Sequence, residues 1–362
     1  MTVAKDFTKP GHNNDFPAGA GEMSRLIREL DWSKTSLGPI ESWSQSLRMM
    51  VSFLLSNRFP LLLWWGHDYI QIYNDAYRPV LGSKHPWGLG LPTSQCWSQI
   101  WHVIGPLIDT PFRGGPATWM DDLSLEINRH GFFEETHFIV AYSPVPDETV
   151  ASGIGGVLAT VHQITEKVIG ERRVEVLRDL GTLDAKSPEE ACAIAARKLA
   201  KHPKDVPFAL LYLIAGDKQH ACLAGTTGIE EGGRLTPEVI DLTEPSEFQA
   251  WPLAQAVVTE TMQVVQDLAA RFGNAVPHGP WTDPPNQAVI VPIRSNIAHQ
   301  LAGFLVAGIS SRLKVDDSYL SFIELAASQI ATAVASARAY EEERKRLRPW
   351  QSWTGQRPLF ST

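Results

Sequence analysis

The sequence predicts an α+β protein with two domains in series. Short apolar runs bounded by turn residues alternate with longer segments of helical periodicity in both halves of the chain. A charged segment with helical spacing, residues 166–184, lies between the two groups of strand-like runs. The length of 362 residues is too great for one typical domain and suits two. We therefore expect two sheet-and-helix domains, joined and followed by long helices.

The composition argues against several classes of protein. The net charge of −8 comes without the block of Lys and Arg that a phosphate-binding surface needs, so we predict no nucleic-acid partner. The three cysteines, Cys96, Cys192 and Cys222, are odd in number and far apart, which argues against a disulfide framework or a metal site and for a reducing compartment. Residues 1–19 lack the apolar core of a signal peptide, and the longest apolar run, Phe59–Trp65, is far shorter than the ~20 residues of a membrane helix. We expect a cytoplasmic protein with no membrane insertion.

The first domain is expected at residues 35–165, after a flexible lead and a short helix in residues 1–34. A helical pattern begins at Ser42 and ends at Pro60. Five runs have strand character: Leu61–Trp65, Tyr69–Tyr73, Ala117–Ile127, Glu134–Tyr142 and Gly153–His162. Helical turns and loops fill the middle, where three prolines interrupt any long helix. Two strands, a helical middle and three strands predict a five-stranded antiparallel sheet with helices on one face.

Residues 166–184 are expected to form a helical linker between the domains. Ile169, Val176 and Leu183 recur every seven residues, a spacing typical of a short coiled coil. These three residues are our candidates for transmitting a signal, and for one seam of a homodimer.

The second domain is expected at residues 185–340. Ser187-Pro188-Glu189-Glu190 has the features of a helix start: a capping hydroxyl, Pro at the first position and acids in the first turn. Strands are predicted at Phe208–Ile214, His220–Ala224, Gln263–Gln266, Ala288–Ile293 and Leu301–Ile309, with a helix at Leu253–Thr261. The last helix, from Asp316 to about Leu347, carries the transmission candidates Ile330, Val334 and Ala337. It is either a dimer helix or an amphipathic helix packed on its own sheet.

The first half resembles the PAS family, in the subgroup found in large bacterial sensor kinases. The motifs that carry this resemblance are Leu37-Gly38-Pro39, Trp43, Ser46-Leu47-Arg48, Phe59-Pro60, Trp64-Trp65-Gly66, Tyr73-Asn74-Asp75-Ala76-Tyr77, Lys84-His85-Pro86, Glu134-Glu135-Thr136 and Tyr142-Ser143-Pro144. PAS domains often end on an Asp-Ile-Thr-like tripeptide that couples the sheet to an exit helix. Here the tripeptide is Gln163-Ile164-Thr165, without its acidic member.

The second half is similar to GAF domains, an α/β sandwich. Pro207–Leu213 looks like their first strand, and Val291-Pro292-Ile293 and Gly303–Val306 look like their last two. The two resemblances imply the signal-sensing input module of a two-component phosphorelay. Such modules bind a small molecule or a partner and pass strain through helical linkers to a histidine kinase. No phosphoacceptor motif and no phosphate-binding loop is recognisable in this sequence, so we expect no enzymatic activity.

The C-terminal segment, residues 341–362, is expected to be a helical exit and an irregular tail. Arg348-Pro349-Trp350 breaks the helical pattern. Kinases of this subgroup continue with a linker resembling Ala-Glu-Leu-Asp-Arg-Ala-Lys-Thr-Ala-Phe-Phe, which permitted codons for residues 348–362 can spell in a shifted frame. The resemblance therefore implies a longer kinase gene truncated by a frameshift, and a full-length kinase as a possible partner.

A ligand pocket is expected in the first domain, where aromatic residues are concentrated. Its candidate residues are Trp64, Tyr73, Asn74, Tyr77, Trp97, Trp101, His102 and Trp119. Such a set suits an apolar cavity with a few polar groups, although a tryptophan-rich core would have the same composition. No cofactor is firmly predicted. His102 is a candidate haem ligand and Cys96 a candidate flavin-reactive thiol, both on weak local evidence.

Two alternative functions remain open. A GAF-type thiol enzyme, such as a methionine sulfoxide reductase, would rely on Cys192 and Cys222, which lack basic neighbours to lower a thiol pKa. A stand-alone adaptor would bind a partner kinase through its long end helices. A metal between His137 and His162 would lack a third ligand.

Overall fold

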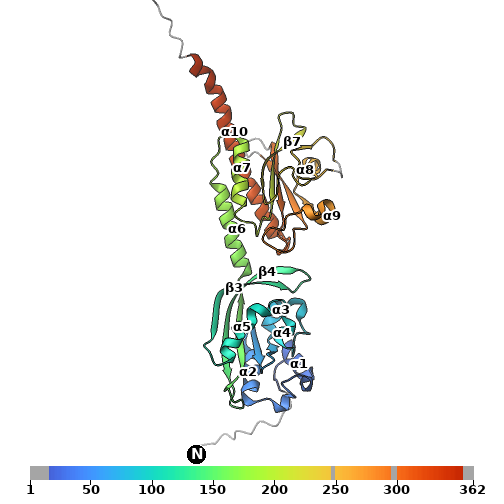
Figure 1. Ribbon diagram of the computed structural model, residues 1–362, viewed down its shortest axis with the longest axis vertical. Coiled ribbons are helices and arrows are strands. Elements are labelled where there is room, and N and C mark those ends of the chain that lie inside the picture. Colours follow the sequence, from blue (N-terminus) through green and yellow to red (C-terminus); the bar gives the residue numbers. More distant parts are fainter. Residues whose placement is uncertain (1–15, 246–248, 295–299, 354–362) are drawn as a thin grey trace, which may run out of the picture. The chain divides into compact units, whose positions relative to one another are not determined.

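The structure, a computed structural model, describes residues 16–245, 249–294 and 300–353, and the chain divides into two compact units between Glu166 and Lys167 (Figure 1). Each unit contains an antiparallel sheet and helices, so the predicted α+β class is confirmed. Residues 1–15 of the lead predicted within residues 1–34, and residues 354–362 of the predicted tail, lie outside the described residues.

The first unit contains the expected five-stranded antiparallel sheet, in the order β2-β1-β5-β4-β3. Its strands are β1 (Leu61–Trp65), β2 (Ile70–Tyr73), β3 (Thr118–Asn128), β4 (Phe133–Pro146) and β5 (Ile154–Gln163). Gly156 on β5 shows why the sheet needs glycine there, because a Cβ at this position would lie 2.3 Å from the Trp64 carbonyl oxygen. Gly155 and Gly156 therefore lie within a strand, as expected for the run Gly153–His162, and start no helix.

Helices cover one face of this sheet (Figure 1). α2 (Gln45–Ser56) packs on β1, and α5 (Trp101–Phe112) packs on β4 and β5. The Ser44 hydroxyl caps α2 by accepting a hydrogen bond from the Leu47 backbone N–H at 3.1 Å. α3 (Arg78–Leu81) and α4 (Thr93–Cys96) are single turns between the sheet's two halves. Cys96 therefore ends α4, and His102 lies on a separate helix, α5, which starts at Trp101.

The short helix of the lead, α1 (Glu22–Glu29), is part of the first unit's core. Met23, Ile27 and Trp32 are fully buried in the same apolar cluster as the sheet. The Trp32 indole N–H donates to the Ile27 carbonyl at 2.7 Å, so this tryptophan is satisfied locally. The short helix was predictable from the sequence, whereas its packing against residues that follow much later in the chain was not.

The second unit has a six-stranded antiparallel sheet in the order β8-β7-β6-β11-β10-β9. The strands are β6 (Ala209–Ile214), β7 (His220–Thr227), β8 (Val239–Asp241), β9 (Gln263–Val265), β10 (Ala288–Arg294) and β11 (Leu301–Gly308). β8 was not predicted, because a three-residue edge strand has too short a pattern to detect. Of the others, β6 is buried almost throughout, because both faces of the sheet are covered.

Helices form a layer on each face of the second sheet (Figure 1). α6 (Thr165–Gly181), α7 (Pro188–Leu199) and α10 (Asp317–Trp353) share one apolar cluster with Leu211 and Leu213 of β6. α8 (Leu253–Thr259) and α9 (Leu268–Phe272) share the opposite cluster with Leu210 and Tyr212. The alternation along β6 thus divides its side chains between two cores. The predicted cap of α7 is present, with the Ser187 hydroxyl accepting from the Glu190 N–H at 3.2 Å.

The residues expected to form a dimer seam are mostly buried inside one chain. Val176, Ile330, Val334 and Ala337 are almost fully buried in the second unit's core, Ile169 is also buried, and Leu183 is partly buried against the same core. The heptad spacing therefore reflects packing of α6 and α10 on their own sheet, which is the second of the two readings of the last helix. A second chain would have to use other faces of these helices.

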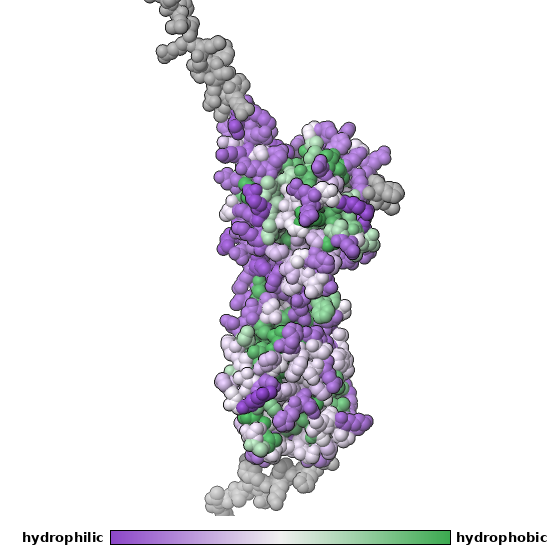
Figure 2. Space-filling model, viewed as in Figure 1, coloured by the Kyte–Doolittle hydropathy of each residue, from purple (hydrophilic) through white to green (hydrophobic). Residues whose placement is uncertain are grey.

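Among the described helices, α10 is long and apolar enough in composition to cross a membrane. Tyr319, Phe322, Ile323 and Ile330 account for much of this apolar character, and all four are buried in the second unit. The exposed end of the helix, residues 341–346, is charged and colours as hydrophilic in Figure 2. Core packing thus explains the composition of α10 without a membrane.

The expected break at Arg348-Pro349-Trp350 is wrong, because α10 continues to Trp353. A proline inside a helix removes one backbone hydrogen bond and crowds the preceding turn, which weakens a helix without always ending it. The prediction from the sequence therefore overestimated how strongly Pro349 would end the helix.

Candidate functional site

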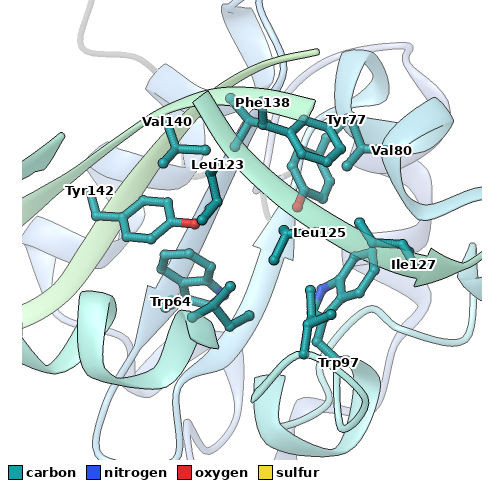
Figure 3. A pocket seen from close by; sticks show the side chains of 13 residues that line it. Trp64, Tyr77, Val80, Trp97, Leu123, Leu125, Ile127, Phe138, Val140 and Tyr142 are labelled. Atoms are coloured by element: carbon teal, nitrogen blue, oxygen red, sulfur yellow. The ribbon is translucent and has the colours of Figure 1, made fainter. Parts of the chain in front are cut away.

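A small cavity lies in the first unit between the sheet and the helices that cover it (Figure 3). Its volume is about 30 Å³. Its thirteen lining residues come from β1, β3, β4, β5 and the helical middle: Trp64, Tyr77, Val80, Trp97, Ile100, Ile104, Leu123, Leu125, Ile127, Phe138, Val140, Tyr142 and Val161. None of them carries a charge. The period-2 alternation of β3 and β4 produces the sheet wall, because every second side chain points to the helices.

The polar atoms of this lining belong to aromatic side chains, two tryptophans and two tyrosines. The Trp64 and Tyr142 rings meet edge to face, with centroids 4.9 Å apart. Figure 3 shows the hydroxyls of Tyr77 and Tyr142 and the indole nitrogen of Trp97 directed toward the middle of the cavity. All four side chains are at least nine-tenths buried.

These polar groups have no partner in the described part of the chain. The indole nitrogen of Trp64 is buried without a hydrogen bond, and no hydrogen bond of the Trp97 nitrogen or of the Tyr77 and Tyr142 hydroxyls occurs among the described residues. A buried polar group without a partner costs about 1–3 kcal/mol, and most folded proteins avoid it. Among the described residues that line the cavity, the Trp64 indole nitrogen is such a group. Together with the three polar groups directed toward the same cavity, it indicates a place where something else is bound.

Burial also fixes the protonation of the two phenols. Desolvation raises the pKa of Tyr77 well above its ordinary value, and the neighbouring Tyr142 adds to the effect. Burial likewise raises the pKa of Tyr142. Both phenols therefore stay neutral and can each donate one hydrogen bond, while the two indoles can only donate.

The structure brings three of the eight predicted pocket residues to this cavity: Trp64, Tyr77 and Trp97. Tyr73 is buried beside it but outside its lining, and its hydroxyl pairs with His85 Nδ1 at 3.1 Å. Asn74 is a structural tether. Its Oδ1 accepts from the Leu61 N–H at 3.1 Å and its Nδ2 donates to the Leu54 carbonyl at 3.2 Å, which joins α2 and the β1–β2 hairpin.

The other three predicted pocket residues do not line the cavity. Trp101 is half-buried beside Tyr69, with ring centroids 5.9 Å apart. His102 is exposed on α5, which is unsuited to an enclosed haem ligand. Trp119 is 64% exposed on β3. These three residues were predicted in the pocket because of their residue types. The direction in which each side chain points depends on helix and strand register, which residue type does not determine.

The sheet wall of the cavity was missed in the sequence. Leu123, Leu125, Phe138, Val140 and Tyr142 lie on β3 and β4, far along the chain from the hairpin on which the prediction concentrated. Their alternation with polar neighbours was a detectable signal of one buried face. Only the pairing of β4 with β5, and of β5 with β1, places that face beside Trp64.

The cysteines do not form a reactive site. Burial raises the pKa of the Cys96 thiol, although Gln71 partly offsets it, and Cys96 does not line the cavity. Burial raises the pKa of Cys192 to about 12, with a smaller contribution from Glu189. A nucleophilic cysteine needs a lowered pKa, so the thiol-enzyme alternative loses one of its two candidates. Cys222, the other, is exposed on β7.

The backbone of His137 on β4 joins the sheet to the start of α6. This residue follows Thr136 on β4 and precedes Phe138, a cavity residue. Its N–H donates to the Thr165 hydroxyl at 2.9 Å, and its carbonyl accepts from the Ile164 N–H at 2.8 Å. The Gln163-Ile164-Thr165 tripeptide thus couples β4 to the start of α6 without an acidic residue.

The imidazole of His137 lies between two carboxylates. Its Nδ1 is 2.6 Å from Asp122 Oδ1 and its Nε2 is 3.1 Å from Glu135 Oε1. The hydrogen bond to Glu135 raises the pKa of His137; burial acts against this and Asp122 adds to it. His162 is exposed and lies across from Ile139. The described residues contain no group of three or more His, Cys, Asp or Glu side chains arranged to hold a metal.

No family model and no curated protein matches the sequence. Solved structures similar to part of the chain include a GAF domain of a Coxiella burnetii phosphoenolpyruvate-protein phosphotransferase, at 18% identity and a TM-score of 0.35, which covers 47% of this chain and 96% of its own. A GAF domain of the Acinetobacter phosphoenolpyruvate-protein phosphotransferase matches at 16% identity and a TM-score of 0.34, covering 48% and 95%. The fRMsr of Staphylococcus aureus, in complex with substrate, matches at 17% and 0.33, covering 45% and 95%. At these values the likeness says nothing about what this chain binds.

Proposed function

We propose that this chain is a signal-input region of a bacterial two-component system, with a PAS-like first unit and a GAF-like second unit and no catalytic centre of its own. The first unit binds a small molecule in its cavity. The observation that carries this proposal is the buried Trp64 indole nitrogen without a hydrogen-bond partner, in a neutral cavity that two tyrosine hydroxyls and the Trp97 indole nitrogen also face. Such groups are the usual means by which an apolar pocket orients a ligand.

The route of transmission is α6. Phe138 and Val161 line the cavity on β4 and β5. The residue next to Phe138, His137, holds the start of α6, and Val161 lies four positions before Thr165. Further along the same helix, Val176 and Leu180 are buried in the second unit's core. A ligand that favours one position of the β4–β5 wall would thereby favour one position of α6.

We further propose that the protein is cytoplasmic, that it forms a homodimer, and that its partner is a kinase carrying the same two units. The dimer would use surfaces other than Val176, Ile330, Val334 and Ala337, because these are buried within one chain. Sedimentation velocity of the purified protein over a range of concentrations tests the dimer. A monomer at all concentrations would overturn it.

Hydrogen–deuterium exchange tests the transmission. Leu125→Phe adds volume to the cavity wall, and we expect it to change the exchange of backbone amides in residues 166–181. Val51→Leu, an enlargement of the α2 core outside the cavity lining, is the matched control. Overpacking costs about 1–3 kcal/mol at either site, so a non-specific loss of stability would affect both. Unchanged α6 exchange in Leu125→Phe, or equal changes in both variants, would contradict the proposal.

A second measurement tests the occupant directly. Native mass spectrometry of the purified chain, compared with its denatured mass, detects any retained small molecule. The absorption spectrum distinguishes haem or flavin from a colourless ligand.

A further inference from the structure

We infer that the ligand of the first unit's cavity is a small, uncharged molecule that accepts hydrogen bonds, such as a short-chain ketone or aldehyde. This inference rests on the proposed sensing function and names the ligand class for that site. Its basis is the balance of donors, acceptors and charges among the thirteen lining side chains.

The cavity supplies more donors than acceptors. Trp64 and Trp97 each contribute an indole N–H, which cannot accept, while Tyr77 and Tyr142 each contribute one hydroxyl. No side-chain amide and no carboxylate lines the cavity. A molecule that only donates would leave both indoles without a partner, whereas a carbonyl oxygen with two lone pairs can accept from two of the four groups at once.

The lining also selects against charge. None of its thirteen residues is charged, and both phenols are held in the neutral form. The ammonium of Lys84 lies outside the lining, 5.4 Å from the centroid of the Trp97 ring. Arg129 is also outside it, where it contacts Glu134 and Gln163. An ion transferred to such a site would lose its hydration without gaining a counter-charge.

The size of the cavity limits the ligand. A cavity of about 30 Å³ has room for about two water molecules, because each needs about 10–15 Å³ of such space. A ligand of several atoms must therefore displace part of the wall. The wall includes aliphatic side chains of β3 and β4, which can adopt other rotamers to make room, and β4 also carries His137, whose backbone N–H is bonded to the first residue of α6.

The test uses three probes of nearly equal shape in the full-length protein. 2-Butanone is neutral and accepts hydrogen bonds, 2-methyl-1-butene replaces its oxygen with a methylene group, and propanoate replaces its methyl ketone with a carboxylate. The readout is the indole N–H signals of Trp64 and Trp97 in proton–nitrogen NMR spectra, assigned with Trp64→Phe and Trp97→Phe. Each probe is titrated to about 100 mM or to its solubility, which covers the weak affinities expected of ligands of this size.

We expect 2-butanone to shift both indole signals saturably. The alkene should bind about tenfold more weakly, because it leaves the donors unpaired. Propanoate should cause no saturable shift. Tyr77→Phe and Tyr142→Phe should each weaken 2-butanone binding about two- to tenfold and leave the alkene unaffected. Tyr69→Phe is the matched control, because its hydroxyl donates to Asp109 outside the cavity.

Three results would overturn the inference: alkene binding as tight as that of 2-butanone, saturable binding of propanoate, or no shift with any probe. The first two would leave the cavity as a ligand site and the sensing function intact, with a different ligand class. The sensing function itself fails on a separate result, unchanged α6 exchange when Leu125→Phe fills the cavity.

Discussion

The backbone N–H of His137 donates a hydrogen bond to the side-chain hydroxyl of Thr165 across 2.9 Å. This contact fastens the first residue of α6 to the middle strand pair of the first sheet. The Gln163 side chain also donates to the same hydroxyl, at 3.1 Å. Thr165 is thus the acceptor for two donors that would otherwise need another partner.

Removal of the Thr165 hydroxyl should loosen the start of α6. We expect Thr165→Val to lower the free energy of unfolding of the first unit by about 1 kcal/mol, since two donors lose their acceptor. Amide exchange in the first turn of α6 should also become faster. Thr165→Ser keeps the hydroxyl and is the control. Equal stability and exchange in Thr165→Val and the wild type would show that the contact has no role in holding the helix.

The stability of the first unit should depend on the protonation of His137. The hydrogen bond to Glu135 raises the pKa of His137 above its ordinary value near 6.5, and Asp122 adds to this although burial opposes it. The folded state therefore binds the proton more tightly than the unfolded state. The resulting stabilisation is fully present below the unfolded pKa and is lost as pH rises through the folded pKa.

Urea denaturation of the wild type and His137→Gln between about pH 5 and 9 measures this effect. The difference in unfolding free energy between the two proteins should be largest at the acidic end and should shrink as pH rises. A difference that is constant over this range would mean that the imidazole has the same proton affinity in both states.

A buried ion pair fastens α6 inside the second unit. Asp205 is fully buried, and its carboxylate accepts hydrogen bonds from the Arg172 guanidinium; Arg173 Nε lies 3.6 Å away. The Tyr319 hydroxyl donates to the backbone carbonyl of Asp205, and the Arg173 guanidinium lies 4.4 Å from the centroid of the Tyr319 ring. This cluster joins α6 to the first turn of α10.

Truncation of this cluster should destabilise the second unit in proportion to what is removed. We expect Asp205→Ala to lower its free energy of unfolding by about 3 kcal/mol, because two largely buried cations lose their counter-charge. Tyr319→Phe removes two neutral hydrogen bonds, the one donated to the Asp205 carbonyl and the one accepted from the Ser310 N–H, and should cost about 1–2 kcal/mol. Chemical denaturation measures both losses of unfolding free energy. A smaller loss in Asp205→Ala than in Tyr319→Phe would show that the ion pair is not the main stabilising contact of this cluster.

Two valines on α6 separate core packing from association. Val176 is 1% exposed and Val174 is 65% exposed on the same helix. Val176→Lys should lower the free energy of unfolding by about 3 kcal/mol or more, because it buries an unpaired charge. Val174→Lys should leave stability unchanged. If Val176→Lys altered sedimentation but not stability, this residue would belong to an interface between chains and not to the core.

The three thiols should differ in reactivity. Cys96 and Cys192 are buried, and burial raises the pKa of both, whereas Cys222 is exposed. A chromogenic disulfide reagent at neutral pH should titrate one thiol per native chain and all three in denaturant. Rapid reaction of a second thiol in the native protein, together with its loss in Cys192→Ser, would restore the thiol-enzyme alternative.

Much of the fold could be predicted because local pattern and tertiary structure agree. β1 has the predicted bounds, Leu61–Trp65, since its apolar run is flanked by Pro60 and Gly66. α7 begins at Pro188, directly after the capping Ser187. The prediction was wrong where one sequence pattern suits two kinds of structure. The seven-residue spacing of Ile330 and Ala337 suits a coiled coil and a core helix equally, and burial in the second unit decides for the core.

The amino-acid pattern was enough to predict the α+β class, the two groups of strands, the aromatic richness of the first unit and the Ser187 cap of α7. These depend on backbone preferences and on the period of apolar residues, which act over a few neighbouring positions. Which aromatics share a cavity could be known only from the folded chain, because strand pairing brings Trp64 and Tyr142 together across 78 positions of the sequence. It also decided that Trp119 faces outward and Val176 inward. A one-residue change of register reverses the face of every side chain on a strand, and no local pattern fixes that choice when both faces carry aromatics.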